Sequence, residues 1–81
     1  MSEGSTGMSL PEALARTGLF FRELWVRYLA LGGSASTLAL EAYVHGALDL
    51  PPIVHDMIAH VFNEEFAERG RDHPVGYRSE R

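Results

Sequence analysis

The chain contains no cysteine and no lysine. The lack of cysteine excludes disulfides, thiolate catalysis and cysteine-ligated zinc. All seven basic residues are arginine, against eleven aspartates and glutamates, and the formal net charge is −4. Residues 32–69 carry six carboxylates and one arginine. This acidic stretch disfavours a nucleic-acid partner, because binding to phosphates depends on neutralisation by Lys and Arg.

Long hydrophobic runs are also absent. A membrane-spanning helix needs about 20 mostly apolar residues, and the most apolar stretch, 19–31, is interrupted by Arg22, Glu23 and Arg27. Residues 1–8 contain neither a basic region nor an apolar stretch, so we expect no targeting segment there. We therefore expect a cytoplasmic location and no membrane partner.

Three segments with apolar residues at helical spacing fill most of the chain: 10–31, 37–48 and 53–69. Ser9, Pro11 and Glu12 form a capping-box signature that begins the first helix. Glycines 32 and 33 are expected to end it, because glycine tolerates the left-handed conformation after a helix. The sequence predicts an all-α fold: a compact three-helix bundle over 9–70, a disordered tail over 1–8 and a mobile tail over 71–81.

The predicted core comes from all three segments. We expect the following side chains to be mostly buried: Phe21, Trp25, Leu40, Tyr43, Val44, Met57, Ile58 and Val61. A chain of this length buries only about 60% of the surface that its unfolded form exposes. Small domains of this kind are commonly stabilised by disulfides, a metal or oligomerisation, and disulfides are excluded here.

The first predicted helix has a second apolar row beside its core stripe. Ala15, Leu19 and Val26 align along a continuous helix, with Arg22 between them and Phe20 at the edge of the row. Gly18 is expected inside this helix, where it would allow another helix to approach closely. Two apolar stripes indicate burial on two sides. The second side faces either the other helices of the same chain or a second copy, and we predict a homodimer interface at Ala15, Leu19, Arg22 and Val26.

Two rows of ionisable side chains are the candidates for chemistry. Asp56, His60 and Glu64 recur every four residues, and Glu41 and His45 form a similar pair. Imidazole and carboxylate groups can hold a divalent metal. The longer row lies on the predicted polar side of its helix, where such residues are normally solvated with weak pairing. We therefore expect no specific metal site and no cofactor.

Acid–base catalysis has few candidates among the remaining side chains. Only His45, His55, His60 and Glu41 are plausible. No serine lies in a nucleophile elbow, and no glycine-rich phosphate loop is present. His55 is expected to be a boundary histidine packed against aromatic side chains. We therefore expect no enzymatic activity.

The second and third predicted helices have the outline of a helix-turn-helix. In that motif the second helix enters the major groove with exposed Arg, Asn, Gln or Ser. The corresponding face here carries Asp56, His60 and Glu64, two of which phosphates would repel. Pro51 and Pro52 occupy the turn. A helix-turn-helix regulator is therefore the alternative function, and nucleic-acid binding is the less favoured one.

Four stretches of the chain resemble small uncharacterised helical proteins of actinobacteria: LWVRYLALGG at 24–33, LEAYVHG at 40–46, LPP at 50–52 and AHVFNE at 59–64. The resemblance covers about half of the chain. It implies a bacterial, cytoplasmic setting and assigns no residue a role. The sequence as a whole favours a small non-enzymatic interaction or regulatory module that self-associates or binds another protein.

Overall fold

The structure is a computed structural model that describes residues 8–70, 75, 76 and 78. These residues form four α-helices and no strand. The helices are α1 (Leu10–Thr17), α2 (Phe21–Ala30), α3 (Thr37–Val44) and α4 (Pro52–Glu68). The predicted all-α class is confirmed. The predicted count of three helices is wrong, because the segment 10–31 forms two helices instead of one.

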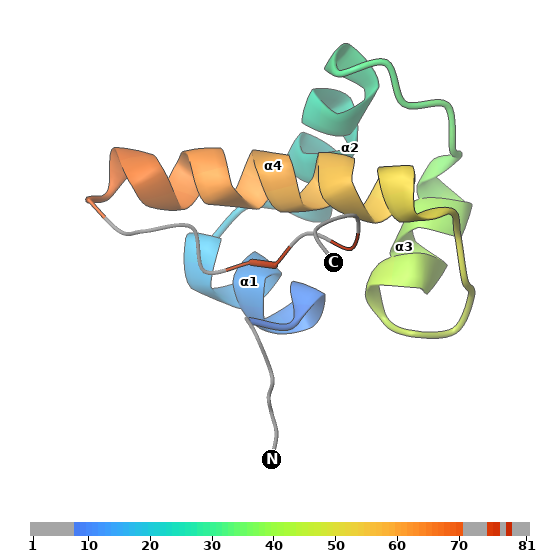
Figure 1. The fold of residues 1–81 in the computed structure, drawn as a ribbon, viewed down its shortest axis with the longest axis horizontal. Helices are drawn as coiled ribbons and strands as arrows, with labels where there is room; N and C mark the ends of the chain where they lie inside the picture. Colours follow the sequence, from blue (N-terminus) through green and yellow to red (C-terminus); the bar gives the residue numbers. More distant parts are fainter. Residues whose placement is uncertain (1–7, 71–74, 77, 79–81) are drawn as a thin grey trace.

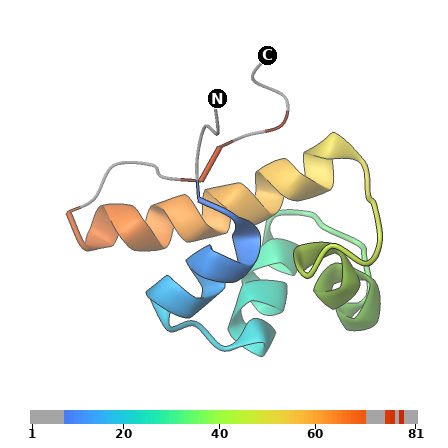
Figure 2. The ribbon, with the colours of Figure 1, turned by 90° about the horizontal axis from the view of Figure 1, so that it is seen from below.

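Helix α4 is the central element (Figure 1). It packs against both α1 and α2, while α3 packs mainly against α2. The three shorter helices lie on one side of α4 (Figure 2). No helix in the described part of the chain is long and apolar enough to cross a membrane.

The break between α1 and α2 begins at Gly18, which has a left-handed backbone (φ 72°). The Thr17 hydroxyl donates to the Leu14 carbonyl (3.1 Å) and accepts from the Leu19 N–H (3.4 Å). Arg69, after the end of α4, donates to the carbonyl oxygens of Arg16 and Thr17. The last carbonyls of a helix have no partner within it, so these bonds stabilise the end of α1. Gly18 is thus a helix stop and not a helix-packing site.

Glycines also end α2 and α3. Gly32 (φ 101°) follows α2 by two residues, as the sequence predicts. The prediction that the next helix runs to residue 48 is wrong. Gly46 (φ 82°) donates to the Tyr43 carbonyl, and Ala47 donates to the Ala42 carbonyl, which together form a Schellman motif. Helix α3 therefore ends at Val44, and residues 45–51 form the connection to α4.

The core lies where α1, α2 and α3 meet α4. Half of the predicted core residues are buried: Leu40, Val44, Ile58 and Val61. The other half are only partly buried and pack around the core: Phe21, Trp25, Tyr43 and Met57. The largest fully buried side chains are those of Tyr28, Phe62 and Phe66. The core is therefore centred nearer to the middle of α4 than the sequence predicts.

Tyr28 organises the connection between α2 and α3. Its hydroxyl accepts hydrogen bonds from the N–H groups of Ser34 (3.1 Å) and Ala35 (3.0 Å). The backbone of Gly33 lies directly against the tyrosine ring, where a Cβ atom would overlap the ring. Glycine is thus needed at position 33 for close approach. The Trp25 indole N–H donates to the Ala35 carbonyl (3.1 Å) and holds the same loop.

The packed structure extends beyond residue 70. Val75 is only 1% exposed and belongs to the core cluster. We predict a mobile tail over 71–81, whereas Val75 lies in the core. Two other described residues of this segment, Gly76 and Arg78, also form hydrogen bonds with the helices. Residues 1–7, 71–74, 77 and 79–81 lie outside the described part, so the predicted tail over 1–8 falls almost wholly outside it.

Candidate functional site

The four predicted interface residues do not lie on one helix. Ala15 is exposed on α1, Leu19 lies in the break, and Arg22 and Val26 lie on α2. The continuous row expected from helical spacing is therefore wrong. Three of the four residues nevertheless share a surface, because Leu19, Arg22 and Val26 line one hollow. Ala15 is not among its lining residues.

This α2 hollow has a volume of about 360 Å³ and is also lined by Glu23 and Arg27. Its apolar members are Leu19, which is partly buried, and Val26, which is 52% exposed. Arg27 is tied to α4 by ion pairs with Glu65 (3.0 Å) and Glu64 (3.7 Å). The hollow is thus an apolar depression framed by charged side chains.

Phe20 follows Leu19 directly in the chain and is the N-cap residue of α2. Phenylalanine cannot accept the hydrogen bond that a capping Ser, Thr, Asp or Asn accepts. The Glu23 carboxylate supplies the remaining half of a capping box by accepting from the Phe20 N–H (2.9 Å). The Phe20 side chain is 76% exposed. It therefore neither caps the helix nor fills the core.

Glu65 joins three helices through two arginines. Its carboxylate accepts hydrogen bonds from Arg27 on α2 (3.0 Å) and from Arg69 (3.1 Å). The Arg69 guanidinium also donates to the carbonyl at the end of α1. The hydrogen bond from Arg27 holds the pKa of Glu65 below its ordinary value of 4.5. Burial opposes this shift, and the Arg69 hydrogen bond adds to it. The carboxylate stays charged and fixes α2, and thereby the hollow, against α4.

The row Asp56–His60–Glu64 does not converge. His60 and Glu64 pair with each other on the surface (3.3 Å). Asp56 is buried, contrary to the polar side expected from its spacing, and accepts from the Arg78 N–H (2.7 Å). Among the described residues, no group of three or more His, Asp or Glu side chains could hold a metal ion.

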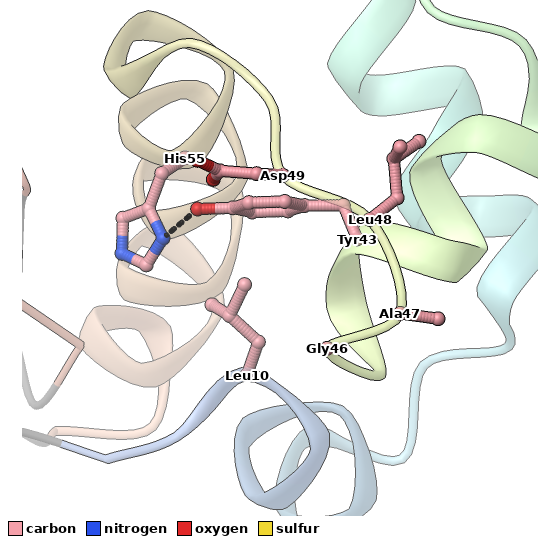
Figure 3. A pocket seen from close by; sticks show the side chains of 7 residues that line it. All are labelled: Leu10, Tyr43, Gly46, Ala47, Leu48, Asp49 and His55. Carbon is pink, nitrogen blue, oxygen red and sulfur yellow. Dashed lines mark hydrogen bonds between the residues drawn. The ribbon is translucent and has the colours of Figure 1, made fainter.

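A second pocket lies between α3 and the start of α4 (Figure 3). Its volume is about 390 Å³, and its lining residues are Leu10, Tyr43, Gly46, Ala47, Leu48, Asp49 and His55. The Tyr43 hydroxyl points at the His55 ring, with 2.8 Å between the hydroxyl oxygen and Nδ1. The two rings meet edge to face at a centroid distance of 6.0 Å. His55 thus bonds to a tyrosine of α3, across the helix connection.

The donors and acceptors around Tyr43 fix the direction of each hydrogen bond. Arg78 Nη1 can only donate, so Tyr43 Oη accepts from it (3.0 Å). The Gly76 carbonyl can only accept, so His55 Nε2–H donates to it (3.0 Å), and in the neutral ring Nδ1 then accepts from the Tyr43 O–H. A neutral imidazole protonated at Nε2 satisfies every partner. Both ring nitrogens of His55 are therefore occupied by the protein itself.

Arg78 is held by α3 and the connection that follows it. Its guanidinium also donates to the Leu50 carbonyl (3.0 Å) and lies 3.5 Å from Asp49 Oδ1. The hydrogen bond with Tyr43 raises the pKa of Arg78 above its ordinary value, and the negative charge of Asp49 acts in the same direction. The arginine remains a permanent cation at the edge of this pocket.

Sequence reasoning missed Arg78, and it placed Phe20 only at the edge of the predicted interface. A signal for Phe20 was present, since an aromatic residue follows Gly18 and Leu19 and lies three residues before Glu23. No local signal marks Arg78, because its partners Tyr43 and Asp49 are 35 and 29 residues away. Comparison of the chain with models of protein families, with curated proteins and with solved structures gives no match, so geometry alone supports a function.

Proposed function

We propose that this chain is a small non-enzymatic interaction module that self-associates through the α2 hollow and Phe20. The observation that carries the proposal is the 76% exposure of Phe20 next to an apolar depression of about 360 Å³. Natural sequences tend to break local rules at functional sites. A phenylalanine at an N-cap breaks such a rule and contributes nothing to the core. We therefore infer that the Phe20 side chain contacts another molecule.

A second copy is the favoured partner because one surface supplies both halves of a contact. Most homo-oligomers are twofold, so that each patch meets its own copy. Phe20 of one chain would enter the hollow beside Leu19 and Val26 of the other, and the reverse contact would follow by symmetry. Aromatic anchors with arginine nearby are typical of interface centres. Arg22 has no ion pair with the described residues and would be available to a carboxylate of the second copy, such as Glu23.

Three of the six exposed large apolar side chains in the described part of the chain lie on or beside α2. Val26 (52% exposed) lies on this helix, and Phe20 and Leu31 (42%) flank its two ends. Burial of apolar surface stabilises association by about 25 cal/mol per Å² before the cost of association is subtracted. A domain of this size has a small core, so association would also stabilise the fold.

The helix-turn-helix alternative is less well supported by the geometry. Its recognition helix would be α4, which is the central helix of the fold and carries seven buried residues. The exposed positions of α4 include His60, Glu64 and Glu68 and therefore present carboxylates. Phosphate binding needs Lys or Arg on the contacting face. The structure thus favours a protein partner for this chain.

The absence of an enzymatic role is supported by the state of His55. A general base needs a nitrogen within hydrogen-bond reach of its substrate. Both ring nitrogens of His55 bond to the chain itself, one to Tyr43 and one to Gly76. His60 pairs with Glu64 on the surface and lines neither the α2 hollow nor the α3–α4 pocket.

The proposal is tested by light scattering and sedimentation from low to high micromolar concentration. We expect the wild type to be dimeric, and Phe20→Ser and Leu19→Glu to be folded monomers by circular dichroism. Leu38→Ser is the matched control, because Leu38 is 77% exposed on α3 and should leave the dimer intact.

A wild type that is monomeric at high micromolar concentration would contradict the proposal. Leu19 is partly buried against the core, so Leu19→Glu could unfold the chain. Phe20→Ser changes an exposed side chain, and a folded Phe20→Ser dimer would therefore also reject the proposed contact.

A further inference from the structure

The C-terminal segment is bound to α4 through its main chain. Asn63, only 2% exposed, donates to the Val75 carbonyl (2.9 Å) and accepts from the Val75 N–H (3.0 Å). One side-chain amide thus forms hydrogen bonds with both the N–H and the carbonyl of one residue. Two α4 side chains continue the pattern, with His55 donating to the Gly76 carbonyl and Asp56 accepting from the Arg78 N–H (2.7 Å).

The three side chains that form hydrogen bonds with the main chain of the C-terminal segment share one face of α4. Asp56 and Asn63 are seven residues apart, which places them two turns apart on the same side of the helix. His55 lies beside Asp56. We name the surface formed by His55, Asp56 and Asn63 the α4 groove. In Figure 2 the short red segment at 75–76 lies on the other side of α4 from α2. None of the three groove residues lines the α2 hollow, so the two surfaces are separate.

Two side chains of the segment provide specific contacts. Val75 is 1% exposed and enters the core. The Arg78 guanidinium contacts the Tyr43 hydroxyl, the Leu50 carbonyl and Asp49 at one end of the α4 groove. Gly76 contributes its carbonyl, which accepts from His55. The groove therefore contacts an aliphatic residue and, three positions later, an arginine.

We propose that the α4 groove is a peptide-recognition site whose ligand is a segment of a partner protein, with an aliphatic residue three positions before an arginine. In this chain the C-terminal segment occupies the site. Contacts directed at the main chain do not depend on which protein supplies it, and peptide recognition commonly combines main-chain hydrogen bonds with a few side-chain pockets. A partner segment with the same two side chains satisfies every contact described above.

A free peptide must compete for the groove with the C-terminal segment of the same chain. A short linker gives a tethered ligand an effective concentration in the millimolar range. A free peptide therefore binds the wild type weakly, and weakening the tethered segment increases the apparent affinity. Loss of charge-assisted hydrogen bonds like those of Arg78 weakens an interaction by about tenfold or more. Arg78→Ala should consequently admit the peptide, whose valine would replace Val75 in the core.

The experiment uses a fluorescent peptide with the sequence of residues 73–80, HPVGYRSE. Its binding to the full-length chain is measured by fluorescence anisotropy. We expect Arg78→Ala to bind the peptide at least about tenfold more tightly than the wild type. The control peptide HPVGYASE should lose that gain, and adding Asp49→Asn to Arg78→Ala should weaken binding of the arginine peptide. Arg22→Ala, on the separate α2 surface, is the matched control and should bind as the wild type does.

A second measurement uses the wild type and needs no folded variant. The side-chain amide signals of Asn63 are followed by NMR during addition of excess peptide. We expect the arginine peptide to shift or broaden them and the control peptide to leave them unchanged. Equal peptide binding by Arg78→Ala and wild type, or unchanged Asn63 signals with the arginine peptide, would overturn the proposal. A wild-type dimer that the free peptide dissociates would assign the groove to a second copy and would also overturn it.

Discussion

Arg69 donates a hydrogen bond to the carbonyl oxygen of Thr17, 52 residues earlier in the chain. The same guanidinium donates to the Arg16 carbonyl and pairs with Glu65. A cation at the carboxyl end of a helix also interacts favourably with the helix dipole. One side chain beyond the end of α4 thus stabilises the end of α1 and fixes the break that exposes Phe20.

Replacement of Arg69 should destabilise the fold although its side chain is 44% exposed. Arg69→Met removes the donors to two helix-terminal carbonyls and one partner of Glu65. We expect a loss of about 1–2 kcal/mol in the free energy of unfolding, measured by urea denaturation. Arg16→Ala is the control, because its exposed pair with Glu12 contributes about 0.5 kcal/mol or less. Equal effects of the two substitutions would contradict this role.

The depressed pKa of Glu65 predicts a stability loss in acid. In the unfolded chain this carboxyl titrates near its ordinary value of 4.5, and in the fold it titrates lower because of the Arg27 hydrogen bond. The unfolded state therefore binds the proton more readily, and stability falls as pH drops from 4.5 through the lower native value. Urea titrations across this range should show a steeper loss for wild type than for Glu65→Gln. Parallel curves would show that Glu65 contributes nothing.

Position 33 should tolerate no side chain. Gly33→Ala would place a methyl group into the Tyr28 ring, which is 1% exposed and held by two hydrogen bonds. Overpacking of this kind costs about 1–3 kcal/mol. Thermal unfolding should show a clear decrease in midpoint for Gly33→Ala and almost none for the neighbouring Ser34→Ala. An unchanged midpoint for Gly33→Ala would mean that Tyr28 does not pack there.

The two isoleucines of α4 provide a matched pair for the core. Ile58 is fully buried and Ile53 is 61% exposed. Ile58→Ala should cost about 2–5 kcal/mol, which is a large share of the stability of so small a domain. Ile53→Ala should change the midpoint of thermal unfolding by no more than a few degrees. Similar effects at both positions would contradict the burial of Ile58.

Local signals in the sequence predict the helix ends that depend on nearby residues. Ser9 caps α1 by accepting from the Glu12 N–H (3.3 Å), and Gly32 follows α2 as expected. Gly46 carried the same signal as Gly32, and it ends α3 earlier than hydrophobic periodicity suggests. Periodicity alone does not detect such a stop, because apolar residues continue past it at 47 and 48.

Features that depend on distant contacts could not be predicted. Asp56 is polar by type and by its spacing with His60 and Glu64, yet it is buried because it binds the main chain at Arg78. Val75 has no apolar periodicity around it and enters the core because Asn63 pairs with its main chain. Leu19, Arg22 and Val26 lie on one surface, as predicted. The continuous helix that was expected to align them is nevertheless broken at Gly18.

Contact between Phe20 of one chain and the α2 hollow of another is the central claim, and isotope-filtered NMR tests it most directly. A sample is prepared from equal amounts of ¹³C-labelled and unlabelled chain, and only contacts between different molecules are recorded. We predict intermolecular signals between the Phe20 ring and the methyl groups of Leu19 and Val26. Their absence at concentrations where light scattering reports a dimer would contradict the claim and place the dimer contact on another surface.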